Sequence, residues 1–258
     1  MAAENERRLM KNHLAFLASH RGKVSEAHDA TLVESDRAEF TYVIPEEGGE
    51  LGNWANRFKT IHLAPWSGDR AAEIDRMRLS KAGAFTYMTL EGDPAAWATN
   101  DRITVKAVKT EADMDIFSEV QARAFAEDQS VYESWHPWLR AANHRNLKNH
   151  KQIFYVGFLD EKPVGTTLTV FDGDTAGFYA VATLPEQRRK GVSQSMMAAA
   201  ISDAYDLRYE LLTLQVAQGS YAEKLYHKLG FRTKFVNPIY SLPVMASVAG
   251  QTPGESSS

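Results

Sequence analysis

The segment FYAVATLPEQRRKGVS, residues 178–193, contains residue types suited to binding an anion. It predicts a strand, then a short basic loop, then a helix. Free N–H groups at a helix N-terminus, together with the helix dipole, attract anions, and Arg188, Arg189 and Lys190 add positive charge there. Gly191 allows a positive φ or a close backbone approach. A pyrophosphate would suit this place, although the same residues are also typical of a solvated basic turn.

Two common nucleotide-binding patterns, GxxxxGK[ST] and GxGxxG, are missing from the sequence. The loop Arg188–Ser193 instead resembles the [QR]-x-x-G-x-[GA] motif of the GNAT N-acyltransferases, in the same strand–loop–helix context. Residues Gly219–Phe231, GSYAEKLYHKLGF, are similar to that family's A-x-x-L-Y-x-x-x-G-F segment. The two segments are separated by about one helix and one strand, as in the family. The resemblance covers roughly residues 101–243.

Two positions depart from the family pattern. Ser193 stands where Gly or Ala is usual, and its small hydroxyl is compatible with a phosphate contact. Gly219 stands where many members have Asn, four residues before Glu223. The second departure removes a common polar contact to the cofactor.

The resemblance implies that acetyl-CoA, or another acyl-CoA, is the cosubstrate. Val181 would offer a backbone N–H to the thioester oxygen, and Ala182 and Thr183 would pair with the pantetheine amides. The pyrophosphate would lie on the residues of the basic loop, which are Arg188, Arg189, Lys190, Gly191, Val192 and Ser193.

Tyr226 would be the general acid that protonates the departing CoA thiolate. A phenol has a pKa about 1.5 units above that of a thiol, so it donates best to sulfur that is already becoming anionic. Without the motif, the sequence would predict that Tyr226 is a core aromatic residue beside Leu225 and Leu229.

The sequence identifies no general base. The third strand, FYAVATL, carries no carboxylate, and candidates by proximity in such a fold are Tyr179, Glu133, His136 and His144. The cluster Trp135-His136-Pro137-Trp138 could line the acceptor pocket, or its tryptophans could anchor the core.

The hydrophobic pattern predicts an α/β fold with a mixed sheet in the C-terminal half. Helices are expected over 111–126 and 134–149, followed by a three-stranded meander. The next helix has a continuous apolar face, and Gly230 is expected to end a short helix. The expected strands are 152–159, 164–171, 177–184, 210–216 and 231–242, the last broken or bulged at Pro238.

The N-terminal half gives weaker signals. Helices are expected over 4–18 and 69–81, and strands over 39–44, 60–63 and 84–90. We therefore expect three segments: an N-terminal α/β domain at 1–95, an acyltransferase domain at 101–243 and a disordered tail at 244–258. The N-terminal domain could be a degenerate copy of the same fold or an unrelated cap. Its loop at 64–70 lacks the phosphate-binding motif, and Asp69 would repel an anion there.

Composition excludes several classes of function. The net charge of −4 does not support nucleic-acid binding. The chain has no Cys, so an acyl-thioester enzyme intermediate is impossible, and its eight His show no metal-binding spacing. No run is long and apolar enough for a membrane helix. We expect a cytoplasmic protein that binds no metal, nucleic acid or membrane and that could form a homodimer.

The leading hypothesis is an N-acyltransferase that moves an acetyl or short acyl group to a primary amine of a small molecule or peptide by direct attack in a ternary complex. The alternative is a non-catalytic acyl-CoA-binding or regulatory module on the same fold.

Overall fold

The computed structural model describes residues 2–55 and 57–242, so the expected tail at 244–258 lies outside the described residues. The helices are α1 Ala2–His20, α2 Gly52–Ala55, α3 Ala71–Arg76, α4 Glu111–Phe125, α5 Gln129–Arg145, α6 Val192–Asp206 and α7 Tyr221–Lys228. The strands are β1 Lys23–Glu26, β2 Ala30–Glu34, β3 Tyr42–Pro45, β4 Thr60–His62, β5 Ser80–Leu90, β6 Ile103–Ala107, β7 Gln152–Leu159, β8 Lys162–Asp172, β9 Thr175–Thr183, β10 Leu211–Ala217 and β11 Phe231–Ser241. Short 3₁₀ turns lie at Ala38–Phe40, Pro65–Ser67, Pro94–Ala96 and Pro185–Gln187.

All the strands form one mixed sheet in the order β1-β2-β3-β4-β11-β5-β10-β9-β8-β7-β6. Pairing is parallel between β3 and β4 and between β9 and β10, and antiparallel elsewhere. The order is nearly a palindrome about the central pair β11 and β5. Strand β5, from the N-terminal half of the chain, pairs with β10, and β11, from the C-terminal half, pairs with β4. Each central strand thus extends the strands of the other half. Neither half therefore completes its own part of the sheet.

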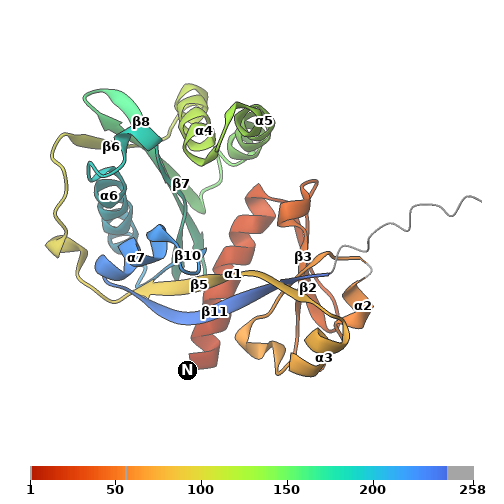
Figure 1. The fold of residues 1–258 in the computed structure, drawn as a ribbon. Helices are drawn as coiled ribbons and strands as arrows, with labels where there is room; N and C mark the ends of the chain where they lie inside the picture. The colour runs from red at the N-terminus through yellow and green to blue at the C-terminus, as the bar shows by residue number, and fades with distance from the viewer. Residues whose placement is uncertain (1, 56, 243–258) are drawn as a thin grey trace, which may run out of the picture.

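Helices cover both faces of the C-terminal part of the sheet. One core gathers the apolar face of α6 with Tyr226, Leu229 and Phe231. The other packs α1 and α4 against β7 and β8, with Phe16 and Phe117 near its centre. Figure 1 shows α6 on one side of these strands and α4 and α5 on the other. A third, smaller core lies under α2 and α3, in the N-terminal half.

The C-terminal elements match the sequence-based expectations closely. The meander and the order of the following helices and strands are confirmed, and Gly230 follows α7 with φ +90°. The expected helix at 134–149 instead begins at Gln129, because the Asp128 side chain accepts a hydrogen bond from the Val131 N–H at 2.9 Å and caps it. The last strand was expected to be broken or bulged at Pro238. It is not broken there, since Pro238 pairs with Ala84, but the ladder shifts register just beyond it, between Ile239 and Tyr240.

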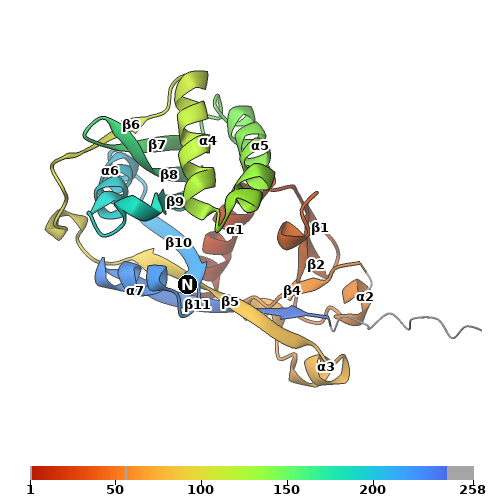
Figure 2. The same ribbon diagram turned by 45° about the horizontal axis from the view of Figure 1, so that its top comes forward.

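The N-terminal half differs more from expectation. The helix expected over 69–81 is shorter, because α3 ends at Arg76 and β5 already begins at Ser80. The strand expected over 39–44 begins only at Tyr42, because residues 38–40 form a 3₁₀ turn. Strands β1, β2 and β6 were not predicted. Figure 2 shows β1, β2 and β4 beside α1, at the opposite end of the molecule from α6.

The topology also corrects the expected position of the N-terminal counterpart of the basic loop. The link from β4 to α3 contains residues 64–70 and is equivalent to the link from β10 to α7. The segment that follows the parallel strand β3, as the basic loop follows β9, is residues 46–51. Its sequence, EEGGEL, is acidic.

Candidate active site

The basic loop enters α6 through two residues with left-handed backbone conformation. Arg189 has φ +64°, and Gly191, the N-cap of α6, has φ +77°. Such a conformation turns successive N–H groups inward and forms an anion-binding concavity. The Asn100 side chain fixes the loop from outside by donating a hydrogen bond to the Lys190 carbonyl at 2.8 Å. The positive φ predicted for Gly191 is confirmed.

The basic side chains of this loop are exposed. The Arg188 guanidinium makes two long hydrogen bonds, to the Thr183 carbonyl at 3.4 Å and to the Ala124 carbonyl at 3.3 Å. Lys190 Nζ donates to Gln187 Oε1 at 2.8 Å. Because backbone carbonyls hold Arg188 only by such long contacts, an anion in the concavity would be a better partner for it.

Strands β9 and β10 separate just before this loop. Their parallel ladder runs only from Thr175 to Gly177 on β9. On the other side, the register with β8 shifts between Thr166 and Leu168, and Ala180 has φ +48°. Val181 therefore lies outside the paired register of both neighbouring strands. The resemblance to the GNAT family predicts a free backbone N–H at this position.

A cavity of about 900 Å³ lies against this part of β9. It lies between the C-terminal end of α4, the basic loop and α7. The residues predicted to bind acyl-CoA or to act as the general acid all line it except Lys190, and those residues are Val181, Ala182, Thr183, Arg188, Arg189, Gly191, Val192, Ser193 and Tyr226. Its size and its positive end suit a long ligand with an anionic group.

Tyr226 lies on the inward face of α7 with 5% of its surface exposed, and its ring makes an edge contact with Phe231 at 5.5 Å. Burial raises the pKa of its phenol, so the group is a neutral O–H at physiological pH. Among the described residues, none makes a hydrogen bond to this hydroxyl, which leaves its proton available to a ligand in the cavity.

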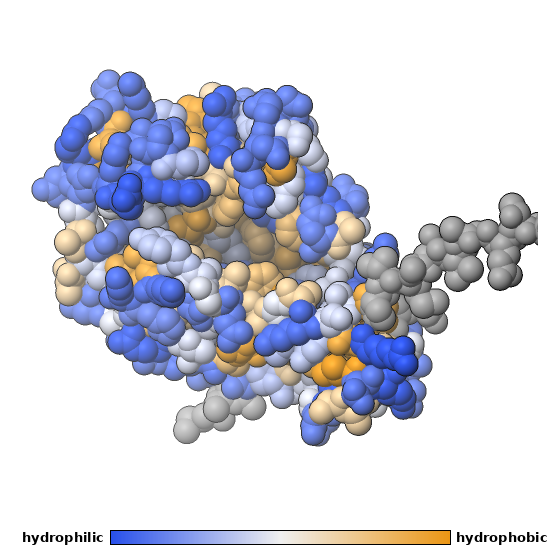
Figure 3. Space-filling model, in the orientation of Figure 1, coloured by the Kyte–Doolittle hydropathy of each residue, from blue (hydrophilic) through white to orange (hydrophobic). Residues whose placement is uncertain are grey.

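A second cavity, of about 440 Å³, joins the first at Tyr226 and Val181, which line both. Phe125 and Ala222 are also shared. Its remaining walls come from β9, β10, α1 and the strands of the N-terminal half. In Figure 3, a hollow with hydrophobic side chains in its depth opens in the middle of the face seen in Figure 1.

The N-terminal half supplies polar residues that sequence reasoning did not connect with the site. His13, Arg21, Glu39, Tyr42 and His62 all line the second cavity. Burial, with the nearby Arg21 charge, lowers the pKa of His13 to about 3, and burial lowers that of His62 to the same range. Both imidazoles are therefore neutral. One sequence signal existed, since Leu9, His13 and Leu17 share a helix face at spacings of four.

Three of the four candidates for a general base lie elsewhere. Glu133, His136 and His144 line neither cavity, and His144 Nε2 is paired with Asp115 Oδ1 at 2.7 Å. They are excluded because α5 packs on the outer side of α4. Tyr179 does line the second cavity, but its hydroxyl donates to Asn12 Oδ1 at 2.6 Å, and burial raises its pKa.

The tryptophan cluster lies behind the cavity wall. The Trp138 ring stacks on Phe40 with centroids 5.4 Å apart, and its N–H donates to Asp36 Oδ1 at 3.0 Å. Trp135 packs at the edge of both rings. The cluster therefore supports Phe40, which lines the cavity, and does not line it.

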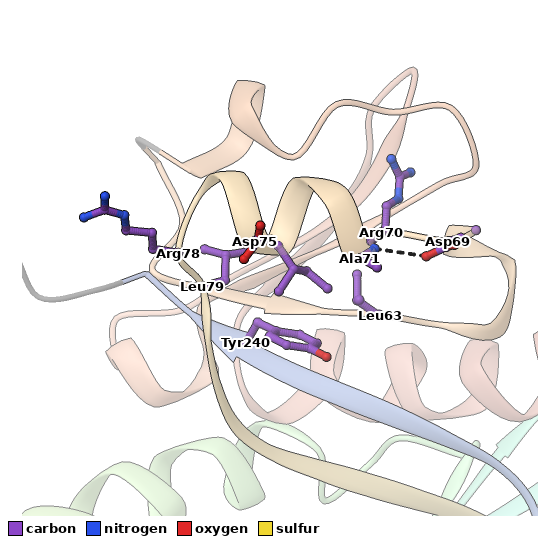
Figure 4. Close-up of a pocket in the computed structure, with 10 residues that line it drawn as sticks. Leu63, Asp69, Arg70, Ala71, Asp75, Arg78, Leu79 and Tyr240 are labelled. Atoms are coloured by element: carbon purple, nitrogen blue, oxygen red, sulfur yellow. Dashed lines mark hydrogen bonds between the residues drawn. The ribbon is translucent and has the colours of Figure 1, made fainter.

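A third hollow, of about 660 Å³, lies beside α3 and shares no lining residue with the other two cavities. Figure 4 shows Tyr240 and Leu63 at its floor, while the Arg70 and Arg78 side chains extend away from it. The Asp69 carboxylate accepts a hydrogen bond from the Ala71 N–H at 3.0 Å. Nothing connects this hollow with the site around Tyr226.

Residues 114–231 match the sequence model described as the Acetyltransferase (GNAT) family. The chain contains a GNAT acetyltransferase domain. This domain is an acyltransferase, and its class of cosubstrate is an acyl-CoA. No curated protein matches the sequence.

Solved structures show the same fold over nearly the whole chain. The GCN5-related N-acetyltransferase from Kribbella flavida has a TM-score of 0.63 at 14% identity, covering 92% of this chain and 95% of that one. The enzyme of the same description from Sphaerobacter thermophilus gives 0.59 at 14% identity, covering 84% and 81%. A tandem GNAT protein from the clavulanic acid biosynthesis pathway gives 0.56 at 13% identity, covering 84% and 80%. At these identities the likeness establishes the fold, with an N-terminal part that is also GNAT-like.

Within residues 2–55 and 57–242, no group of His, Asp and Glu side chains gathers in a way that could hold a metal ion. The helices of the same residues include none with the length and apolar character needed to span a bilayer.

Proposed function

We propose that this protein transfers an acetyl or other short acyl group from CoA to a primary amine of a small molecule or peptide, by direct attack within a ternary complex. One observation carries the proposal: two cavities of different character meet at Val181 and Tyr226. The first has the positive loop that a pyrophosphate needs. The second is lined largely by aromatic and aliphatic side chains and is large enough for a small amine.

In this proposal the basic loop holds the diphosphate of acyl-CoA, and the strand edge at Ala182 and Thr183 pairs with the pantetheine amides. The Val181 N–H then donates to the thioester oxygen and stabilises the negative charge that develops there. The amine nitrogen forms a bond to the carbonyl carbon while the carbon–sulfur bond breaks. The Tyr226 hydroxyl gives its proton to the departing sulfur.

The amine must be neutral to attack. An apolar cavity disfavours the charged form of a bound amine and lowers its pKa, so the ammonium loses its first proton more readily to solvent. After attack, the nitrogen loses a second proton. We assign this proton to water, because a pKa near 3 makes the neutral rings of His13 and His62, which line the cavity, too weakly basic to hold it at neutral pH.

We further propose that residues 1–95 and 101–243 are two units of one ancestral fold, of which only the second binds CoA. The near-palindromic sheet order supports this division, with a parallel strand pair in each half. The N-terminal unit then serves as the wall of the acceptor cavity.

Thiol release from acetyl-CoA with a library of small primary amines tests the proposal. Wild-type protein should release CoA with some of them, and Tyr226→Phe should lower kcat roughly 100-fold or more while changing KM little, since the lost proton acts in the transition state. Tyr205→Phe is the matched control, because Tyr205 is 42% exposed on α6 and lines neither cavity. Binding of acetyl-CoA without turnover on any amine would favour the regulatory module instead.

A further inference from the structure

The second cavity contains a cation without a partner. Arg21 follows α1, is partly buried and lines the cavity. Among the described residues its guanidinium makes one hydrogen bond, a long one from Nη1 to the His20 carbonyl at 3.4 Å. In the part of the chain that the structure describes, no carboxylate lies within ion-pair distance of this guanidinium. Burial, with the charge of Arg37, lowers the pKa of Arg21 to about 10, so the group stays charged at neutral pH.

Aromatic rings hold the guanidinium in place. Its central carbon lies 4.9 Å from the Phe16 ring centroid, 5.2 Å from that of Phe40 and 5.1 Å from that of Trp138. These contacts stabilise the cation through the faces of the rings. They leave most of its N–H groups without acceptors, and a planar guanidinium matches a carboxylate in a two-point contact.

The other titratable groups near Arg21 are either paired with an opposite charge or neutral. Glu39 also lines the cavity, but it is exposed and paired with Arg37 at 3.0 Å. His13 and His62 are neutral for the reason given above, and His20, behind Arg21, is held neutral in the same way. Arg21 is therefore the only unmatched charge in this wall, and burying an unpaired charge is costly unless an anion compensates it.

Much of the rest of the wall is apolar. Leu17, Leu214 and Val216 add aliphatic surface, and the aromatic residues are Phe16, Phe40, Tyr42, Phe85, Phe178, Tyr179 and Tyr226, with Phe125 at the junction. At about 440 Å³ the volume lies near the lower end of the range of small-molecule sites. The space suits a molecule the size of a single amino acid with an apolar side chain.

We propose that the acceptor is a free α-amino acid with an apolar or aromatic side chain, whose carboxylate binds Arg21 while its amine faces Val181 and Tyr226. This inference rests on the proposed function for the amine, but the carboxylate site stands on its own geometry. A peptide bond in place of the free carboxylate would leave the guanidinium unmatched, so an internal peptide amine is disfavoured.

Calorimetry in the presence of saturating CoA tests the carboxylate site without requiring turnover. L-phenylalanine and L-leucine are compared with their uncharged carboxamides, L-phenylalaninamide and L-leucinamide. The wild type should bind at least one free amino acid roughly 10-fold or more tightly than its amide, as expected for a hydrogen bond to a charged group. Arg21→Met should remove that preference by weakening the free acid alone, and Arg21→Lys should restore part of it.

Arg57→Met is the matched control, because Arg57 also lies over a ring, that of Phe58 at 5.2 Å, and lines neither cavity. It should keep the wild-type preference. Equal binding of acid and amide, an unchanged preference in Arg21→Met, or no binding of any of the four compounds would overturn the inference. Thiol release from acetyl-CoA, measured in separate samples with the same compounds, reports on the proposed function, since binding without turnover contradicts only the latter.

Discussion

Gly92 and Gly230 lie in direct backbone contact, although they belong to opposite halves of the chain. A Cβ added to Gly92 would lie 2.8 Å from the Gly230 Cα, and the Gly92 N–H donates to the Gly230 carbonyl at 3.1 Å. The contact closes the ends of the central strand pair β5 and β11, through which each half completes the sheet of the other. Space for a side chain is missing on both sides.

We therefore expect Gly92→Ala to destabilise the protein by about 1–3 kcal/mol, the usual cost of overpacking. Gly83→Ala is the control, because Gly83 lies toward the other end of β5, and an added Cβ there meets nothing within 4 Å. Urea unfolding of both variants measures the difference. Equal urea midpoints for the two variants would show that the backbones at Gly92 and Gly230 move apart without loss of stability.

The second prediction concerns the basic loop. Arg188→Ala combined with Gly191→Asp should weaken acetyl-CoA binding at least 100-fold, because it removes one positive charge and places a carboxylate at the helix N-terminus. Gly191 also has φ +77°, which disfavours any side chain.

Gly173→Asp controls for backbone strain, because Gly173 has φ +58° in the turn between β8 and β9, with open space around it. Calorimetry should find wild-type affinity in Gly173→Asp. Full affinity in a folded Arg188→Ala/Gly191→Asp protein would contradict the assignment of the pyrophosphate site.

The sequence was sufficient for the elements whose partners are near in the chain. The apolar face predicted for α6, including Met196, Ala200 and Ile201, is fully buried. Its pattern is clear because the helix packs mainly on β6 to β9, which belong to its own half of the chain. The basic loop is recognisable for a similar reason, since its charges and its glycine are contiguous.

The N-terminal half was less predictable because its strands pair with distant segments. Strand β5 was expected, but nothing in its own residues indicates that it lies between β10 and β11. Strand β1, KVSE, is a short edge strand with no alternating apolar pattern. Arg21 and His62 could not be assigned to the site from sequence, because only the shared sheet brings them to the cavity of the other half.

The third prediction concerns pH. His13, His20 and His62 are buried, and burial lowers the pKa of each from 6.5 to about 3. Below pH 6.5 the unfolded chain binds protons that the native state does not, so native stability is complete above this pH and is lost as the pH falls toward 3. The loss is about 1.4 kcal/mol per pH unit for each such histidine.

Unfolding by urea at pH 7.5 and at pH 5.5 measures this loss. His20→Gln should lose less stability between pH 7.5 and pH 5.5 than the wild type, since it removes one of the three histidines whose pKa is lowered on folding. His28→Gln, at an exposed position, should behave as the wild type. The same loss of stability in all three proteins would show that these histidines are not responsible.

The last prediction is the number of CoA molecules bound per chain. In the N-terminal half, Glu46, Glu47 and Glu50 follow the parallel strand β3, in the place where Arg188, Arg189 and Lys190 follow β9. Three carboxylates repel a diphosphate, and α2, at four residues, is too short to supply the dipole of a longer helix. Calorimetry with CoA should therefore give one equivalent per chain. The Arg188→Ala/Gly191→Asp variant should show no residual site of comparable affinity, because the N-terminal half offers none. Two equivalents in the wild type would show that the acidic segment binds CoA after all.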